Sequence, residues 1–570
     1  MKYDINIILS GFSGEGIQFM GYHLSYILHM NNYYIKTYNN IPSEILSPTK
    51  TITDLSEFII RFSNKKIISY FNFKNNIFLF TNYISYKKNI NRIKFNSILI
   101  FDFNNIFLNK ILKSNFLNNY RIYILNTKEY IFLKYKFKLK YNLINKLKNS
   151  FYIGFILYLF NLPINISKVF LKNKFIFKKK IYLLNYKLLK MGYKIGRNKI
   201  KNRINLLKNK SKLSYTNQLI NGNLGIVLGI IHYSIKYNIN IFYSSYPITP
   251  STTISNYIKK NSKYFKNIKF FDAEDEISAI NTSIGASLYN EYIGVISTSG
   301  PGMSLIQESL GLAVVYEIPL IIINVQRVGP STGYPTKIEQ SDLMQAIYGR
   351  HGEAPIPVFA IHNISNTIKL IQNILKLSFK LQTPIIILSD INISSNYSLC
   401  KKYNKFKIIN NIKIKNKLIY NISKNKCIGG LVNNINNHYK IIKKRQKKIN
   451  YILKYKKINY ILNINKKGRI LIISWGSTFE IIRESINILI KKKYKIGYIH
   501  FICLYPIQYK LIENSYYNFK KIIIFELNNK QLYYIIKSYS TINKDILFYN
   551  KMNGETFTVY EIIKKIKKIY

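Results

Sequence analysis

Cysteine is scarce in this chain of 570 residues. The only cysteines, Cys400, Cys427 and Cys503, lie far apart, and no Cys-x-x-Cys pair occurs. This spacing excludes a disulfide framework, and it excludes a cysteine-held iron–sulfur cluster or structural zinc ion. We therefore expect no metal site in this chain and a location in the reducing cytoplasm.

Long apolar runs are also missing. The most membrane-like run, Phe151 to Ile166, is interrupted by Asn161 and Pro163 and falls short of the roughly 20 apolar residues that a membrane span needs. The first ten residues are strand-like and lack the basic region and cleavage site of a signal peptide. We expect no membrane partner.

Acidic residues are few, with 25 Asp and Glu against 86 Lys and Arg, which gives a net charge of +61. Such an excess ordinarily indicates nucleic acid or an anionic surface as a partner. Here lysine, asparagine, isoleucine and tyrosine, whose codons are rich in A and T, are in excess together, as in residues 172–180 and 443–457. A base-composition bias explains this pattern, and no arginine-rich stripe accompanies it, so we expect no nucleic-acid partner.

Three phrases between Tyr246 and Glu353 make little sense as packing alone. They are YPITPST at 246–252, AEDE at 273–276 with TSGPG at 298–302, and QRVGPSTG at 326–333. Glycine, proline and small hydroxyl residues shape backbone that comes close to a ligand, and each phrase sets a charged or hydroxyl side chain beside that backbone. The pattern indicates a cofactor site.

The flanking segments predict a parallel α/β sheet. We predict strands at 239–244, 292–297, 320–325 and 384–388, and helices at 276–288 and 303–316. Ligands of such sheets gather at the carboxyl ends of the strands, and all three phrases lie at such ends.

The remaining segments predict further α/β domains. A strand at 3–9, the turn GFSGEG at 11–16 and a helix at 17–30 form a Rossmann-like entry, although the glycine spacing fits a tight structural turn as well as a phosphate site. Strands at 469–474, 497–503 and 521–525 predict another α/β unit. We expect domains at 1–195, 216–400 and 468–570, with a linker or peripheral segment at 401–467.

The order of these motifs resembles the pyrimidine-binding half of thiamine diphosphate enzymes. More closely, the three phrases resemble the alpha subunit of 2-oxoacid:ferredoxin oxidoreductases, in the 2-oxoglutarate (KorA-like) branch. Residues 11–16, and residues 42–45 with 51–62, are similar to the family's gamma domain, although Glu15 stands where glutamine is usual, and a carboxylate there opposes a bound phosphate. Segments 475–477, 526–529 and 553–558 are similar to its carboxy-terminal domain.

The resemblance implies an α/β fold of three α/β domains. These are a Rossmann-like gamma domain, a thiamine diphosphate pyrimidine-binding domain and a transketolase C-terminal-like domain. It also implies a catalytic Glu276, whose carboxyl hydrogen-bonds the ring nitrogen of the aminopyrimidine and must hold its proton near neutral pH. From the residues alone, Glu274, Asp275 and Glu276 fit a helix amino terminus equally well.

Further roles follow from the same resemblance. Thr249, braced by prolines on both sides, would contact the cofactor and the 2-oxoacid, and Arg327 and Thr336 would bind the 2-oxoacid. Pro250, Ser299 and Gly300 would complete the cofactor contacts. A stiff structural turn at Thr249 and a structural salt bridge at Arg327 are the alternatives.

A missing motif implies a partner. The diphosphate half of a thiamine site needs a Gly-Asp-Gly entry that holds a divalent metal, and no Gly-Asp pair occurs in this chain. The resemblance therefore implies that a beta subunit contributes the diphosphate site, the Mg ion and a 4Fe-4S cluster, in a heterodimer or a dimer of heterodimers.

The implied reaction is coenzyme A-dependent oxidative decarboxylation of 2-oxoglutarate, with electrons passed to ferredoxin. Pyruvate or branched-chain 2-oxoacids are alternative substrates, and a decayed, non-catalytic subunit is an alternative function.

Overall fold

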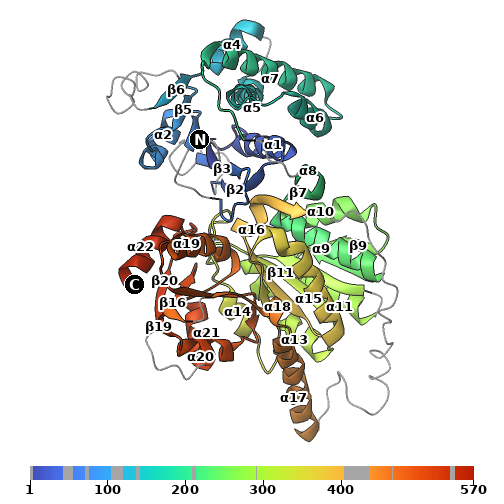
Figure 1. Ribbon diagram of the computed structural model, residues 1–570. Helices are drawn as coiled ribbons and strands as arrows, with labels where there is room; N and C mark the ends of the chain where they lie inside the picture. Colours follow the sequence, from blue (N-terminus) through green and yellow to red (C-terminus); the bar gives the residue numbers. More distant parts are fainter. Residues whose placement is uncertain are drawn as a thin grey trace. The chain divides into compact units, whose positions relative to one another are not determined.

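The computed structural model describes residues 4–42, 55–70, 76–103, 120–135, 141–207, 213–289, 292–402, 435–464, 467–539 and 546–570. The chain forms two compact units, of which the first holds residues 1–219 with 397–402 and the second holds 220–396 with 403–570 (Figure 1). Cys427, residues 43–45 and residues 51–54 lie outside the described residues.

The first unit is built on a mixed sheet. Its strand order is β6-β5-β4-β1-β3-β2-β14-β7. The central strand β1 is antiparallel to β3 and parallel to β4. The strands are β1 (Asp4–Phe12), β2 (Tyr34–Asn40), β3 (Leu55–Ser63), β4 (Asn76–Phe80), β5 (Ile98–Phe101), β6 (Arg121–Ile124), β7 (Asn217–Asn221) and β14 (Tyr397–Lys401).

Apolar helices cover this sheet. The predicted helix at 17–30 is confirmed as α1, and its buried face shares one core with the apolar face of α5. The helices of the unit are α1 (Ile17–Met30), α2 (Tyr83–Asn89), α4 (Thr127–Tyr135), α5 (Tyr141–Leu159), α6 (Asn165–Lys174), α7 (Lys179–Lys199) and α8 (Leu213–Thr216).

Helices α5 and α7 approach each other closely through glycine. A Cβ atom on Gly154 would lie 2.0 Å from the Leu189 carbonyl oxygen, and one on Gly192 would lie 2.0 Å from the Phe151 carbonyl oxygen. Neither position has room for a side chain, because the obstructing atoms are backbone.

The second unit contains a nearly all-parallel sheet with the order β18-β12-β13-β11-β10-β8-β9. Only β18 is antiparallel to its neighbour. The strands are β8 (Asn240–Ser245), β9 (Ile268–Asp272), β10 (Tyr292–Thr298), β11 (Leu320–Gln326), β12 (Val358–Ala360), β13 (Ile385–Asp390) and β18 (Cys503–Tyr505).

Its helices follow the predicted pattern with one difference. The predicted helix at 276–288 is confirmed as α11, whereas the one predicted at 303–316 begins earlier, at Gly300, and is interrupted at Ile306. The Gln307 side-chain amide donates to the Met303 carbonyl (2.7 Å) and satisfies the carbonyl at the interruption. The helices are α9 (Gly222–Tyr237), α10 (Thr252–Ser262), α11 (Glu276–Leu288), α12 (Gly300–Leu305), α13 (Gln307–Val315), α14 (Leu343–Tyr348), α15 (Thr367–Leu381) and α16 (Ile391–Ser395).

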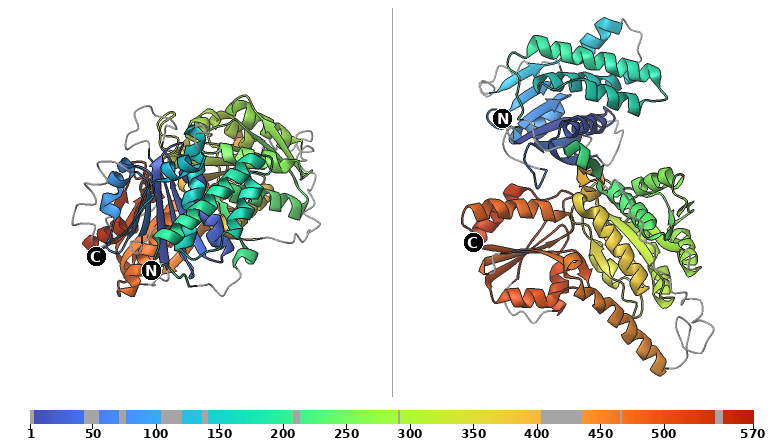
Figure 2. Two further views of the ribbon diagram at one scale, coloured as in Figure 1. Left: turned by 90° about the horizontal axis from the view of Figure 1, so that it is seen from above. Right: turned by 45° about the vertical axis from the view of Figure 1, so that its right-hand side comes forward.

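A third sheet, with the order β15-β17-β16-β19-β20, completes the second unit (Figure 2). Its core is continuous with that of the preceding sheet, because Ile473 and Phe501 belong to the same buried cluster as Ile296 and Ile322. The strands are β15 (Tyr460–Ile464), β16 (Gly468–Trp475), β17 (Ile496–Phe501), β19 (Phe519–Glu526) and β20 (Ile546–Asn550).

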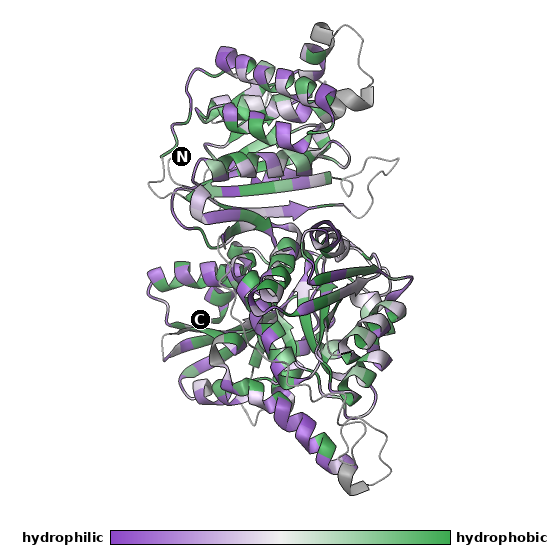
Figure 3. Cartoon of the chain, turned by 90° about the vertical axis from the view of Figure 1, so that its right-hand side faces the viewer, coloured by the Kyte–Doolittle hydropathy of each residue, from purple (hydrophilic) through white to green (hydrophobic). Residues whose placement is uncertain are grey.

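The helices near the third sheet differ in character. Helix α17 is strongly hydrophilic (Figure 3), whereas α19 and α22 each bury an apolar stripe. The helices are α17 (Ile435–Tyr451), α18 (Lys456–Asn459), α19 (Phe479–Lys491), α20 (Tyr509–Tyr516), α21 (Gln531–Tyr539) and α22 (Val559–Ile569). The predicted class, α/β with several multi-stranded sheets, is confirmed. Among the described residues, no helix combines the length and the apolar character that a membrane crossing needs.

The close crossing of α5 and α7 yields a stability prediction. Replacement of Gly192 by alanine should lower the free energy of unfolding of the first unit by about 1 to 3 kcal/mol, because the new methyl group overlaps backbone. Denaturant titration of the full chain measures the change. The control Lys187→Ala alters an exposed position on the same helix, and equal stability of the two variants would contradict the packing argument.

Candidate functional site

The predicted site lies along one edge of the second sheet. Strands β11, β10, β8 and β9 are adjacent and parallel. Their carboxyl ends therefore lie at the same edge, and each is followed by one of the glycine-, proline- or acid-rich phrases. The structure thus brings together segments up to 80 residues apart in the sequence.

The first turn of α11 distinguishes three neighbouring acids. Glu274 and Asp275 are exposed, and Asp275 caps the helix by accepting the Ser278 N–H (2.6 Å). Glu276 is buried, with 7% of its surface exposed. A helix-capping role therefore accounts for Asp275 and leaves Glu276 unexplained.

Glu276 packs against the turn that follows β10. A Cβ atom on Gly302 would lie 2.5 Å from Glu276 Cγ and 2.1 Å from Thr298 Oγ1, so only glycine fits at this position. Burial raises the pKa of the Glu276 carboxyl above its usual value, and the neighbouring charge of Asp275 acts in the same direction, whereas the backbone N–H of Glu276 opposes them. The result is an acid that keeps its proton to higher pH than an exposed glutamate.

Arg327 joins the ends of β11 and β8. Its Nη1 donates a hydrogen bond to the Thr249 carbonyl oxygen (2.6 Å). The side chain is buried, with 6% exposed, and its Nε atom has no hydrogen-bond partner among the described residues. None of their carboxylates lies within ion-pair distance of it. Burial lowers the pKa of its guanidinium, and the charge of Asp342 acts in the opposite direction. A buried cation without a direct ion pair is costly and can bind an anion.

Arg327 and Gly300 line a pocket of about 580 Å³ together with two acids, Glu339 and Asp342. The Asn324 side chain donates to Asp342 Oδ2 (2.9 Å), and the Gly329 N–H donates to Glu339 Oε2 (3.3 Å). Burial raises the pKa of both carboxyls, whereas the charge of Arg327 lowers that of Asp342. The sequence analysis did not single out Glu339 and Asp342. Two acids so close to the QRVGPSTG motif at 326–333 are notable in a chain with few acidic residues, and this closeness was a sequence signal for the site.

The other predicted site residues are only partly brought together. Ser299 and Thr336 each have a buried hydroxyl without a hydrogen-bond partner. Thr249 is exposed, and Pro250 is half-buried with its carbonyl accepting from the Asn223 side chain (3.1 Å). No hydrogen bond links Thr336 to Arg327 within the described part of the chain.

These orphaned groups fit a polar cofactor and an anionic substrate. The Ser299 hydroxyl and the Arg327 Nε atom are buried donors that a ligand would satisfy. The carboxyl of Glu276 makes no side-chain hydrogen bond to another described residue. Its burial favours the protonated form, which can donate to a ring nitrogen.

The third sheet holds the segment that carries Asp342. Asn528 Nδ2 donates to the Gln340 carbonyl (2.8 Å), and Gln531 Nε2 donates to the Ser341 carbonyl (2.6 Å). Gln340 N–H in turn donates to the Leu527 carbonyl (2.9 Å). Residues 527, 528 and 531 therefore fix one wall of the pocket.

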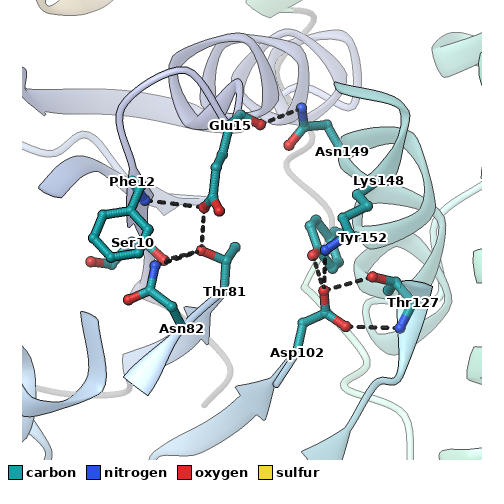
Figure 4. A network of polar contacts seen from close by, with 10 residues as sticks. All are labelled: Ser10, Phe12, Glu15, Thr81, Asn82, Asp102, Thr127, Lys148, Asn149 and Tyr152. Atoms are coloured by element: carbon teal, nitrogen blue, oxygen red, sulfur yellow. Dashed lines mark hydrogen bonds and ion pairs between the residues drawn. The ribbon is translucent and has the colours of Figure 1, made fainter. Parts of the chain in front are cut away.

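The glycine-rich turn of the first unit is occupied by its own carboxylate (Figure 4). Glu15 Oε2 accepts the Phe12 N–H (3.0 Å) and the Thr81 hydroxyl (2.6 Å). Across the same view, Asp102 accepts from Thr127 (2.8 Å to its N–H) and pairs with Lys148 (3.3 Å). The Phe12 donor that an anion would use is thus already satisfied within the chain.

Comparison with known proteins agrees with this arrangement. The family described as pyruvate ferredoxin/flavodoxin oxidoreductase matches residues 6–195. A thiamine diphosphate-binding pyruvate flavodoxin/ferredoxin oxidoreductase domain matches residues 234–448, and pyruvate:ferredoxin oxidoreductase core domain II matches residues 469–562.

Two individual relatives are subunits of 2-oxoglutarate oxidoreductases or synthases. The 2-oxoglutarate oxidoreductase subunit KorA of Mycobacterium tuberculosis is 29% identical over 68% of this chain and 60% of the relative. The 2-oxoglutarate synthase subunit KorA of Archaeoglobus fulgidus is 42% identical over 30% of this chain and 48% of the relative. The chain thus spans about half to three fifths of the length of these two relatives.

A solved structure is similar over the full length. The 2-oxoglutarate:ferredoxin oxidoreductase from Magnetococcus marinus, solved with 2-oxoglutarate, coenzyme A and succinyl-CoA bound, has a TM-score of 0.85 and 25% identity and covers 100% of both chains.

The burial of Asp342 makes stability depend on pH. Its pKa is raised above the ordinary value of 3.8, so the folded chain binds the proton more tightly than the unfolded chain. Stability from this group is therefore complete below pH 3.8 and is lost as the pH rises through the raised pKa. Relative to Asp342→Asn, the wild-type free energy of unfolding should fall by on the order of 1 kcal/mol between pH 3.5 and pH 7. Urea unfolding across this range measures it, with the exposed Glu274→Gln as control, and a pH-independent difference would contradict the assignment.

Proposed function

We propose that this chain is the alpha subunit of a 2-oxoglutarate:ferredoxin oxidoreductase, with a gamma-type domain fused at its amino terminus. The three matching oxidoreductase family domains, the KorA relatives and the Magnetococcus structure support this proposal. The reaction is coenzyme A-dependent oxidative decarboxylation of the 2-oxoacid, with electrons passed singly to ferredoxin. The names of the KorA relatives and the ligands of the Magnetococcus structure support 2-oxoglutarate and coenzyme A as substrates.

One observation carries this proposal. The Arg327 guanidinium is buried at the carboxyl edge of the sheet, its Nε is free, and no described carboxylate pairs with it. A planar cation with an unused donor suits a carboxylate, the group common to all 2-oxoacids. The Thr249 carbonyl accepts a hydrogen bond from Arg327, and the buried Thr336 hydroxyl has no hydrogen-bond partner among the described residues. We assign both threonines to the substrate.

Glu276 is the proposed catalytic residue. Bound thiamine diphosphate supplies the nucleophilic carbon and the electron sink for decarboxylation. Glu276 holds a proton at its carboxyl and donates it in a hydrogen bond to the aminopyrimidine ring. Ser299 and Gly300 at the start of α12, with Pro250, complete the contacts, and the apolar neighbours of Glu276 exclude water.

The site is completed by a second polypeptide. The chain lacks the Gly-Asp-Gly entry of the diphosphate half, so we assign the Mg ion, the diphosphate contacts and a 4Fe-4S cluster to a beta subunit. Ferredoxin is the proposed electron acceptor, and a cytoplasmic location fits such a cluster. Pyruvate and branched-chain 2-oxoacids are the second candidate substrates, and the pyruvate oxidoreductase names of the matching family domains favour testing them.

Loss of the proton donor should stop turnover. In the complex with the beta subunit, Glu276→Gln should lower the rate of coenzyme A-dependent viologen reduction by about 10²- to 10⁴-fold. The matched control is Glu274→Gln, two residues earlier and exposed, which should keep the wild-type rate. Gel filtration verifies assembly of both complexes, and a wild-type rate in Glu276→Gln would refute the catalytic assignment.

Loss of the planar cation should weaken substrate binding. Arg327→Lys should raise the KM for the 2-oxoacid about 10- to 100-fold, because lysine keeps the charge and loses the fork of donors. Steady-state kinetics with 2-oxoglutarate, pyruvate and branched-chain 2-oxoacids would rank the candidate substrates. The control is Arg350→Lys, since Arg350 donates to the carbonyls of Ala346, Ile347 and Ala354. That variant should lose stability and keep its KM, and an unchanged KM in Arg327→Lys would exclude the substrate role.

A further inference from the structure

One long segment of this lysine-rich chain contains no basic residue. Residues 270–326, a run of 57, contain no lysine or arginine, whereas 86 such residues in 570 predict about nine in a run of that length. The run holds seven acids. Parts of it are the buried strands β10 and β11, where lysine is excluded by burial. The helices α11, α12 and α13 also belong to it, and these have exposed faces.

Apart from the short helices α14 and α16, which have no basic residue either, the other helices of the second unit carry lysine or arginine on their exposed faces. Helix α10 carries Lys259 and Lys260, α15 carries Lys369, Lys376 and Lys380, and α19 carries Arg483 and Lys491. The general lysine excess is thus absent from α11, α12 and α13, which are adjacent in space. We infer that these three helices have a surface on which lysine is disfavoured.

Most of the exposed positions on these helices are apolar or small, and Asn281 and Glu308 are the exceptions. Helix α11 packs beside α12 and α13, and all three bury their inner faces in one core. The outer face, which we call the lysine-free face, presents Ile277, Asn281, Gly285 and Tyr289 from α11 and Leu305 and Leu312 from α12 and α13. Ile277 is 45%, Leu305 is 54% and Tyr289 is 68% exposed.

Gly285 on α11 and Gly311 on α13 face open space within the described part of the chain. A Cβ atom on Gly285 or Gly311 would meet no atom within 4 Å. Glycine in a helix interior destabilises the helix relative to alanine, and open space here removes any internal reason for it. Close approach of another helix to these positions supplies the missing reason.

Charge and position identify the occupant. Exposed Glu274 and Glu308 at the margins make no ion pair with a described residue, whereas Glu317, at the far end of α13, already pairs with Lys448 of α17 (2.6 Å). The face begins at Glu276, the first residue of α11 and the centre of the proposed site. A chain that supplies the other half of that site therefore meets α11 along this face.

We propose that the lysine-free face is the docking surface for the beta-type partner that completes the thiamine diphosphate site. This inference rests on the proposed function. The partner contributes an apolar helical surface with basic residues at its rim, opposite Glu274 and Glu308. Binding of the partner buries the side of the Glu276 site that this chain leaves open.

The test measures binding of the full-length chain to the purified beta-type chain of the same genome, chosen for its Gly-Asp-Gly entry. Gly285→Lys and Leu312→Lys place lysine on the face. Ile488→Lys on α19 is the control, because Ile488 and Leu312 are both 36% exposed. The face variants should raise the dissociation constant at least about tenfold, whereas the control should bind like the wild type. Gly285→Lys should also melt at or above the wild-type temperature, since lysine is the better helix former.

Each other outcome is decisive. Unchanged dissociation constants in the face variants, or no binding by the wild type, would overturn the proposal. If lysine on the face instead breaks self-association and leaves partner binding intact, the occupant is a second copy of this chain and the proposal is wrong. Viologen reduction by the wild-type complex separates the two proposals. An inactive complex that still forms through this face contradicts only the function, and an active complex with normal binding by the face variants contradicts only the docking surface.

Discussion

The hydrogen bond from the Arg327 guanidinium to the Thr249 carbonyl is the contact on which the site depends. Strand β10 lies between β8 and β11 in the sheet, so the arginine side chain crosses the carboxyl end of β10. The turn that follows β10 contains Gly302, which packs against Glu276. One buried cation thus joins the loops after β11 and β8, and the free energy that its burial costs is recovered when an anion binds.

The rest of the second unit supports this edge. The sheet supplies parallel strands whose carboxyl ends coincide, and the α11–α13 layer positions Glu276 in an apolar environment. The side-chain amides of Asn528 and Gln531 donate to the carbonyls of Gln340 and Ser341, next to Glu339 and Asp342 on the wall of the pocket. Burial raises the pKa values of both acids of the pocket, although the chain carries a net charge of +61 and the Asn324 hydrogen bond and the Arg327 charge lower the pKa of Asp342.

Much of this arrangement was accessible from the sequence. Helix α11 and strand β10 were predicted to within a residue because continuous apolar patterns and a Gly-Pro-Gly turn bound them. The interruption at Ile306 was not, since it depends on a side-chain amide that competes with the helix backbone. Strand β14, only five residues long, joins the first sheet through a pairing that no local pattern reveals. Glu339 and Asp342 became visible only when folding placed them opposite Arg327, and the roles of Thr336 and Ser299 stay predictions.

We propose that Glu276 presents a protonated carboxyl to an aminopyrimidine that this chain only half encloses. A high-resolution structure of the chain with its beta-type partner and thiamine diphosphate tests it most directly. We predict that a Glu276 carboxyl oxygen lies within about 2.7 to 3.2 Å of a pyrimidine ring nitrogen, with Arg327 and Thr249 facing the substrate position. A Glu276 side chain directed into solvent, or a cofactor enclosed entirely by this chain, would contradict the account.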